Sequence, residues 1–496
     1  IPQAPEGAEK LRAADFSARI SKFLVPDGYK GRIRSLISVS LNANIEQLLD
    51  EISELKETLN KNSTNSSKPP SSDGLARPKT RSLRQKSGKK PGGQKGHKGV
   101  TIKVPEKADI VIEHYPEECS HCHLFGKCKG KFCRQQASRY VTDIKIAKEV
   151  TEHITMRIER CPLHGGALGG AFPEGVSARV QYGTTIETFV VNQSMDGTGA
   201  DKISRTARNF FGLESFSTGS VINMIESCAS KLEGAERFIK QQLVNSTVNH
   251  YDETGVNVNG KLNWTHSASN LLFTLLVLSG KRGAAGMEEL GVIGKQHGVA
   301  VHDCWEPYWK FGNVAHALCC VHLLRELNGV IENHPGQKWA PKFKMFLEEL
   351  YGLKKSYDSC GRPMEECYRS YFGYMYDSLI GIAKKENPLP EISGKRRGRR
   401  KKGKVRSLID RLESRKESVL LFTTSCDIPF SNNAAEQTVR NLKVKTKIAG
   451  CFRSEAGAKA YLRLRSYIDS ARKHGFDACQ AIRLAFEGSP CLCLGC

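Results

Sequence analysis

Three acidic residues, remote from one another in the chain, are of the type and placement that bind divalent metal ions. Asp252 lies in STVNHYDETGVNV, a run with the composition of a β-strand, and Asp303 follows the short apolar run GVAVH. Glu436 falls in the first turn of a helix predicted to begin at Asn432, whose side chain is expected to accept a hydrogen bond from an open backbone N–H. Carboxylate oxygens favour Mg²⁺ or Mn²⁺ over zinc, so these three side chains are candidate ligands for such an ion.

The expected order of secondary structure explains how these carboxylates meet. From residue 246 the sequence predicts three strands, a helix around Met287–Ile293 and a fourth strand, which is the opening order of a ribonuclease-H-like fold. The third strand, LLFTLLVLSG, is apolar enough for a buried central strand. In such a sheet the first and fourth strands are neighbours, so Asp252 and Asp303 lie at one edge, while Glu253 points to the opposite face. Together with Glu436 they can hold two divalent ions about 3.5–4 Å apart, which suits phosphodiester hydrolysis and strand transfer.

A row of cations follows Glu436 along its predicted helix. Arg440, Lys443 and Lys447 stand four, seven and eleven residues after the acid, so all of them share its face. A carboxylate at the head of such a row suits a helix that lies along a phosphate backbone. The alternative is an ordinary ion pair on a solvated helix.

The overall charge points to a polyanionic partner. Among 496 residues, 75 Lys and Arg outnumber 52 Asp and Glu, which gives a net charge of +23. The basic block at 394–406, GKRRGRRKKGKVR, has no apolar periodicity and is predicted to be an exposed loop that contacts phosphate through Lys395, Arg396 and Arg397. No apolar run approaches the roughly 18 residues of a membrane span, and no signal-peptide pattern is present, so nucleic acid is expected rather than a membrane.

Two metal-ligand pairs precede the acidic residues in the chain. Cys119-x-x-Cys122 and Cys161-x-x-His164 flank a partly alternating run that predicts a β-hairpin. A two-residue gap lets both side chains of a pair reach one tetrahedral ion, so the segment predicts a structural Zn²⁺ in a zinc-ribbon arrangement. Seventeen cysteines in a basic chain without a secretory signal favour metal ligands and free thiols over disulfides. The cysteines between the pairs that could replace a ligand are Cys128 and Cys133.

A further Cys-x-x-His motif lies between the second and third carboxylates. Cys319 and His322, with Cys320 and His316 nearby, invite a metal interpretation, but the motif supplies only two ligands. Packing or orientation beside the acidic residues is an equal alternative, so this motif is not counted among the predicted ligands.

The N-terminal part of the chain predicts self-association. Apolar residues recur in alternating steps of four and three, the seam of a coiled coil, although one amphipathic helix packed on its own domain is the alternative. The Ser/Asn/Pro-rich and basic, Gly-rich stretches after it cannot bury a core, so a flexible linker is expected there. The heptad residues are Leu41, Ile45, Leu48, Ile52, Leu55 and Leu59.

The predicted fold class is multidomain α+β, in which a ribonuclease-H-like α/β catalytic core with a helical insertion follows a coiled-coil helix and a zinc-ribbon-like module. Helices flanking a short turn near residue 214 have helix-turn-helix proportions, although most such pairs are plain helical packing. The expected segments are an unassigned stretch (1–34), a leucine-zipper-like helix (35–61), a basic flexible linker (62–108), a zinc-binding module (109–178), a helical region (179–245), the first part of the core (246–330), the helical insertion with its basic loop (331–425), the last part of the core with the Glu436 helix (426–485) and a Cys-rich tail (486–496).

Several stretches together resemble bacterial transposases of the insertion-sequence family numbered sixty-six, over roughly residues 36–485. They are the heptad segment, LNKNSTNSSKPPSSDG, SGKKPGGQKGHKG, the CxxC pair, YDETG, VHDCW, HALCCVHLLREL and NNAAEQTVRNLKVKTKIAGCFRSEAGA. The resemblance implies a DDE transposase in which Asp252, Asp303 and Glu436 take the catalytic roles.

The same resemblance implies partners and a location. It implies that the chain binds double-stranded DNA at the element ends and at the target, forms a homo-oligomer through the zipper, acts beside small accessory proteins of the same element, and resides in the bacterial cytoplasm. The alternatives are a nuclease on the same core that hydrolyses without joining, and an inactive regulatory DNA-binding derivative. The three carboxylates are all present, which counts against the last of these.

Overall fold

The structure is a computed structural model that describes residues 55–66, 105–115, 117–121, 137–142, 144, 146–160, 163–164, 166–389 and 402–492. Its central feature is a five-stranded mixed sheet surrounded by many helices, so the chain has a mixed α/β architecture. The unassigned stretch 1–34 and the heptad residues from Leu41 to Ile52 lie outside the described residues.

The sheet has the strand order β5-β4-β3-β6-β7. The strands β3 (Val248–Val258), β4 (Lys261–Ser269) and β5 (Thr274–Ser279) pair antiparallel, whereas β6 (Gly298–His302) and β7 (Val314–Leu318) run parallel to β3. The β3–β4 hairpin turns at Asn259 and Gly260, which both have positive φ (48° and 74°). An Asn-Gly pair is the preferred sequence for this two-residue turn, because both positions require a left-handed backbone.

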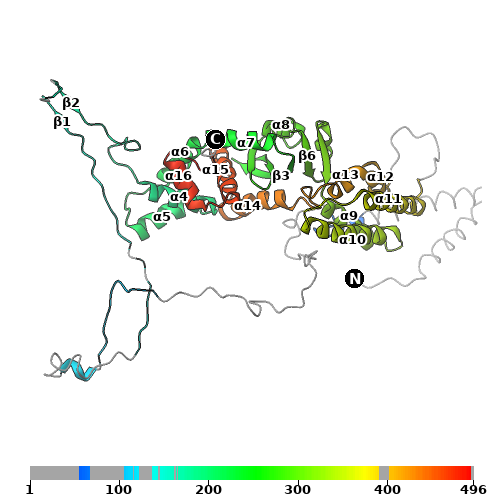
Figure 1. Ribbon diagram of the computed structural model, residues 1–496, viewed down its shortest axis with the longest axis horizontal. Coiled ribbons are helices and arrows are strands. Elements are labelled where there is room, and N and C mark those ends of the chain that lie inside the picture. Colours follow the sequence, from blue (N-terminus) through cyan, green and yellow to red (C-terminus); the bar gives the residue numbers. More distant parts are fainter. Residues whose placement is uncertain are drawn as a thin grey trace, which may run out of the picture.

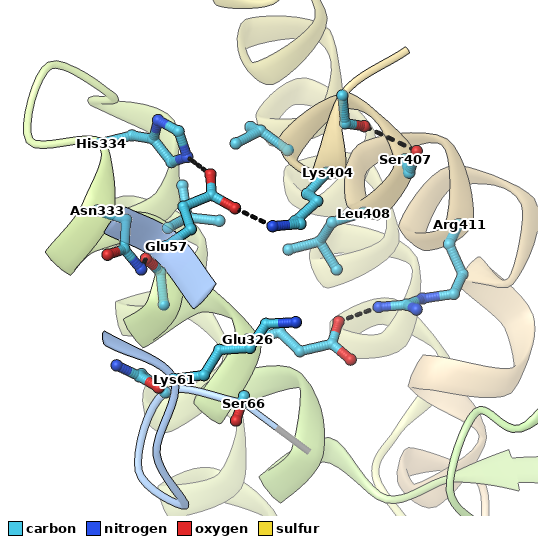
Figure 2. Close-up of a pocket in the computed structure, with 15 residues that line it drawn as sticks. Glu57, Lys61, Ser66, Glu326, Asn333, His334, Lys404, Ser407, Leu408 and Arg411 are labelled. Carbon is cyan, nitrogen blue, oxygen red and sulfur yellow. Dashed lines mark hydrogen bonds and ion pairs between the residues drawn. The ribbon is translucent and has the colours of Figure 1, made fainter. Parts of the chain in front are cut away.

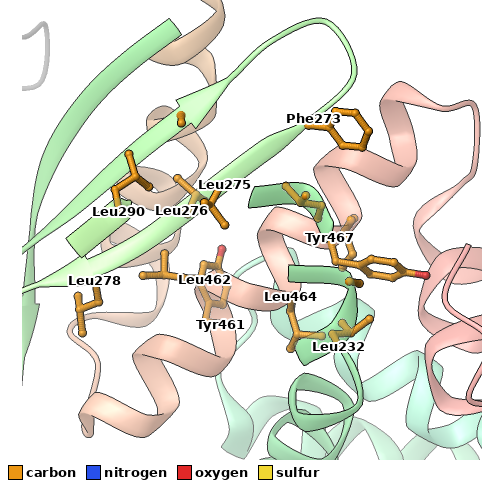
Figure 3. Packing of buried hydrophobic residues seen from close by; sticks show 14 of the residues in the cluster. Leu232, Phe273, Leu275, Leu276, Leu278, Leu290, Tyr461, Leu462, Leu464 and Tyr467 are labelled. Carbon is orange, nitrogen blue, oxygen red and sulfur yellow. The ribbon is translucent and has the colours of Figure 1, made fainter. Parts of the chain in front are cut away.

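Strand β5 lies at the edge of the sheet, which corrects the expectation of a central strand. It is nevertheless buried, because helix α15 (Glu455–Lys473) packs along it and Ser466 and Ser470 accept hydrogen bonds from the N–H groups of Leu276 and Thr274, both at 2.9 Å. Figure 3 shows the leucines of β5 beside the apolar residues of α15. The unpaired edge is thus covered by a helix, and the apolar run in the sequence reflects this cover rather than a central position.

One group of helices packs around this end of the sheet. Helices α5 and α6 flank the predicted turn and share a small core with α4, but the helix-turn-helix interpretation stays a prediction. Helix α8 (Ala284–Leu290) precedes β6, as expected from the sequence. The helices of the group are α4 (Thr184–Met195), α5 (Ala200–Phe211), α6 (Thr218–Lys231), α7 (Glu233–Val244), α15 and α16 (Ala478–Phe486).

A second group of helices follows β7 and forms a second core around Trp339, Phe343 and Tyr376. Figure 1 shows these helices on the far side of the sheet from α4 and α16. The basic block belongs partly to this group, because α12 begins at Lys404 and so includes the last three residues of the predicted loop. The helices are α9 (Cys320–Asn333), α10 (Trp339–Ser359), α11 (Glu366–Glu386), α12 (Lys404–Ser414) and α13 (Lys416–Leu420).

Residues 55–66 pack against this second group. Glu57 accepts hydrogen bonds from His334, at 2.7 Å, and from Lys404, as Figure 2 shows. The buried Asn65 donates to the Glu332 carboxylate at 2.7 Å, so the first residues of the predicted linker form a docked turn. Leu55 and Leu59, the heptad residues that the structure describes, remain largely exposed.

The described residues between 105 and 178 contain little regular structure. A two-residue ladder joins β1 (Arg157–Ile158) to β2 (Leu168–Gly169) on either side of the second predicted ligand pair. Of the described residues between 139 and 156, none belongs to a strand, so the hairpin expected there is not formed within that run. Its alternating Val and Ile side chains are exposed and therefore bury no apolar face that would stabilise a sheet.

Gly329 of α9 provides a test of the docked turn. A Cβ at this position would lie 2.4 Å from the backbone oxygen of Asn65, so Gly329→Ala should release residues 55–66 from α9. We expect limited proteolysis within 60–66 to become at least roughly tenfold faster, which corresponds to about 1.4 kcal/mol of lost docking energy. Gly352→Ala in α10 is the matched control, because a Cβ there meets nothing within 4 Å. Equal cleavage rates in the two variants would contradict the docking.

Candidate active site

Asp252 and Asp303 lie side by side where β3 and β6 run parallel. His250 pairs with Val301 in this register, so two residues further on Asp252 stands opposite Asp303, just beyond the end of β6. The Asp252 carboxylate accepts the backbone N–H of Glu253 at 2.9 Å, and that of Asp303 accepts the N–H of Trp305 at 3.0 Å. The parallel pairing of these strands thus places two carboxylates that are 51 residues apart in the sequence next to each other.

Glu436 comes from helix α14 (Asn433–Ala449), which begins after Asn432 as expected. The role expected for the Asn432 side chain is wrong, since it makes no capping hydrogen bond. Its amide instead donates to the Tyr251 carbonyl at 2.7 Å, and its oxygen lies 2.8 Å from His250 Nδ1. The buried side chain therefore fastens the start of α14 to β3, and this contact brings Glu436 to the two aspartates.

The three acids all have raised pKa values. Burial raises the pKa of Asp252 well above its usual range, and the neighbouring charges of Glu253, Asp303 and Glu436 raise it further. Burial, followed by the charge of Glu253, raises the pKa of Asp303 to about 6. Burial also raises the pKa of Glu436, against the opposing charges of Arg325, Lys443 and Arg440.

Glu253 is a fourth carboxylate that sequence reasoning set aside. Its side chain is only 4% exposed and pairs with Arg282 at 3.0 Å and with the Tyr308 hydroxyl at 3.2 Å. The Arg282 guanidinium is in turn stacked on Trp264 and Trp305, at 4.6 and 4.4 Å from the ring centroids. Strand alternation predicted that Glu253 points away from Asp252, so it was not counted as a site residue. The acid next to Asp252 and an arginine just after β5 were the sequence features that could have indicated its role.

The cations predicted along α14 are placed differently from one another. Arg440 is exposed and Lys443 half-buried, and both act on the pKa of Glu436, whereas Lys447 is exposed further along the helix. Lys445, on another face, is stacked on Phe452 and Tyr461 at 4.1 and 4.6 Å and so holds the helix to the core. Lys395, Arg396 and Arg397 lie outside the described residues.

The Cys-x-x-His motif also reaches this site. The Cys319 thiol, one His322 nitrogen and a Glu436 oxygen all lie within 4.8 Å of one another. In the described part of the chain, these three side chains are the group whose spacing suits binding of a metal ion. Asp252 and Asp303 do not belong to that tight group. The Cys-x-x-His motif therefore lies next to Glu436, a third candidate ligand that could not be recognised from the sequence.

The donor set of the acidic residues fits a hard divalent cation. Asp252, Glu253, Asp303 and Glu436 are partly buried and have raised pKa values, and the charge of another member contributes to the shift of Asp252, Asp303 and Glu436. Such a surplus of buried negative charge is neutralised by an ion with oxygen ligands, of which Mg²⁺ and Mn²⁺ are the usual ones in proteins.

The predicted zinc ligands are described only in part. Cys119 lies half-buried in the short helix η2 (Glu117–His121), and His164 is exposed in a turn. Cys122 and Cys161, like the alternative ligands Cys128 and Cys133, lie outside the described residues. The structural zinc remains a prediction.

Comparison with known families identifies the class of protein to which this site belongs. The profile described as "Transposase IS66 family" matches residues 179–460, more than half of the chain and all three predicted catalytic positions. The chain belongs to this family, whose members are DNA-acting enzymes. A second profile, of a family of unknown function, matches residues 7–103, and no curated protein matches the chain. Within the described residues, none of the helices has both the length and the apolar character of a membrane span.

The charge density of the site predicts how stability depends on pH. The folded state holds the Asp303 proton up to about pH 6, whereas the unfolded chain releases it near 4, so the unfolding free energy of metal-free protein falls as pH rises from about 4 to 6. The contribution of Asp303 is about 3 kcal/mol. Asp303→Asn should therefore unfold at a higher temperature than the parent protein in EDTA at neutral pH, and this gain should disappear near pH 4. Glu226→Gln, an exposed acid on α6, is the control, and a lower neutral-pH melting temperature for Asp303→Asn would contradict the electrostatics.

The contacts of Asn432 with β3 predict how firmly the start of α14 is attached. Asn432→Ala removes both side-chain contacts and leaves a buried carbonyl unpaired, which should cost about 2–3 kcal/mol in the attachment of α14. We expect faster hydrogen exchange in the first turns of α14, measured peptide by peptide. Asn433 is exposed, so Asn433→Ala is the control and should leave hydrogen exchange in α14 unchanged. Equal exchange rates in the two variants would show that Asn432 does not attach α14 to β3.

Proposed function

We propose that the chain is a DNA transposase in which Asp252, Asp303 and Glu436 catalyse strand cleavage and 3′-hydroxyl strand transfer. Two observations support the proposal: the β3–β6 register, which sets Asp252 opposite Asp303, and the Asn432 contact, which attaches the start of the Glu436 helix to β3. The order β5-β4-β3-β6-β7, with three antiparallel and two parallel strands, supports assignment of the sheet to the ribonuclease-H-like class.

The chain's own residues prepare a site for divalent cations. Asp252, Asp303 and Glu436 would hold two Mg²⁺ or Mn²⁺ ions, and Glu253, fixed by Arg282 and Tyr308, adds negative charge beside them. When bound, such ions activate a water or a 3′-hydroxyl and stabilise the leaving oxygen.

Other parts of the chain would hold the DNA. Arg440, Lys443 and Lys447 extend from the acidic site along α14, so a phosphate backbone lying on this face would pass the carboxylates. The basic loop with Lys395, Arg396 and Arg397, the zinc module and the region of α5 and α6 are proposed to add contacts to the element ends. The zipper is proposed to pair subunits, and small accessory proteins to assist in the cytoplasm.

Replacement of one carboxylate tests the proposal directly. Asp303→Asn should reduce Mg²⁺-dependent cleavage of DNA bearing the element ends by at least about 10³-fold, because a ligand charge is lost, while binding of the ends is retained. Glu226→Gln is the matched control and should cleave like the parent protein. Full cleavage by Asp303→Asn would falsify the assignment.

Strand transfer is tested separately from cleavage. Pre-cut ends with free 3′-hydroxyls are offered together with target DNA, and the products are resolved on a denaturing gel. Joined products support the transposase, whereas hydrolysis without joining identifies a nuclease. Binding without either reaction identifies a regulatory derivative.

A further inference from the structure

A second set of ligand atoms, of different chemistry, lies beside the acidic site. It joins the start of α9, which carries Cys319 and His322, to the first turn of α14, which carries Glu436. One sulfur, one imidazole nitrogen and one carboxylate oxygen lie within 4.8 Å of one another. Neither the metal chemistry proposed for the aspartates nor the predicted zinc module uses Cys319 or His322.

The Cys319 side chain is buried between the start of α9 and Asn432, the residue that precedes α14. Its buried sulfur accepts the backbone N–H of Asn432 at 3.2 Å. Cys319 occupies the N-cap position of the 14-residue helix α9, where the helix dipole favours negative charge. The Asn432 N–H and the start of α9 thus both lie at this one sulfur atom.

His322 presents a nitrogen that the protein leaves unpaired. Its Nδ1 atom is buried without a hydrogen-bond partner and lies 3.9 Å from Glu436 Oε1. A buried nitrogen without a hydrogen bond destabilises the folded state by about 1–3 kcal/mol, and a bound ligand or ion would remove this cost. The two-residue gap between Cys319 and His322 is the spacing with which a single turn delivers two ligands to one ion.

We propose that Cys319, His322 and Glu436 bind one transition-metal ion of the Zn²⁺ type, distinct from the oxygen-bound ions at the aspartates. Sulfur, imidazole and carboxylate donors together select a borderline ion such as Zn²⁺ over Mg²⁺. Three protein ligands leave a fourth position for water or a substrate oxygen. The ion would tie α9 to α14 and fix the Glu436 carboxylate next to Asp252 and Asp303.

Cobalt binding to the full-length protein tests this site. Variants that lack Cys119 and Cys161 remove ligands of the predicted zinc module and serve as the background. Co²⁺ added to this background should give a thiolate-to-metal charge-transfer band, with one ion bound per chain in a form that Zn²⁺ displaces and excess Mg²⁺ does not. Cys319→Ser should abolish the band, and His322→Asn should weaken binding at least tenfold.

The adjacent thiol provides the matched control. Cys320 is also fully buried, but its sulfur lies 3.6 Å from the carbonyls of Leu318 and Val419 and outside the proposed site. Cys320→Ser should therefore keep the cobalt band. Equal spectra and equal stoichiometry for Cys319→Ser and Cys320→Ser, or unchanged affinity in His322→Asn, would overturn the proposal.

This test does not depend on the transposase chemistry, because it is read without DNA. Asp303→Asn should keep the cobalt band while it loses cleavage. If the parent protein binds cobalt at Cys319 yet never cuts DNA, only the proposed function fails. If it cuts DNA but no band depends on Cys319, only the metal site fails.

Discussion

The site depends on one buried side chain, Asn432, which joins three elements that are far apart in the sequence. Its amide contacts β3 on two atoms, and its backbone N–H donates to Cys319 at the start of α9. Because a buried amide left unpaired is costly, all these contacts must form together. The start of α14, and with it Glu436, is thereby held at the end of β6, where Asp303 leaves the sheet.

A second constraint is the concentration of negative charge that this joint creates. Four partly buried carboxylates lie around the β3–β6 junction, and the stacked guanidinium of Arg282 pairs with Glu253. The other acids face Arg325 of α9, Arg411 of α12 and the cations on one face of α14. The same helix therefore completes the acidic site and presents the basic surface that DNA requires, which fits a chain of net charge +23.

The helices that follow β7 are connected to this arrangement through α9. The docked turn at residues 55–66 contacts α9 and α12, while the first residues of α9 reach Glu436. The C-terminal part of helix α9 thus contacts residues 55–66, and its N-terminal end carries the candidate metal ligands.

The sequence by itself determined the local elements and the residue types of the site. Alternation and apolar runs predicted β3, β4, β6 and α9, and the Asn-Gly pair marks the β3–β4 turn, because these signals depend on neighbours in the chain. What the tertiary structure alone decided involves partners remote in sequence. Serines of α15 cover the edge of β5, Asn432 binds β3 instead of capping α14, Glu253 adds its charge from the opposite face, and Glu436 completes a ligand set with Cys319 and His322. Each of these contacts requires a distance across the fold, which spacing along a chain does not contain.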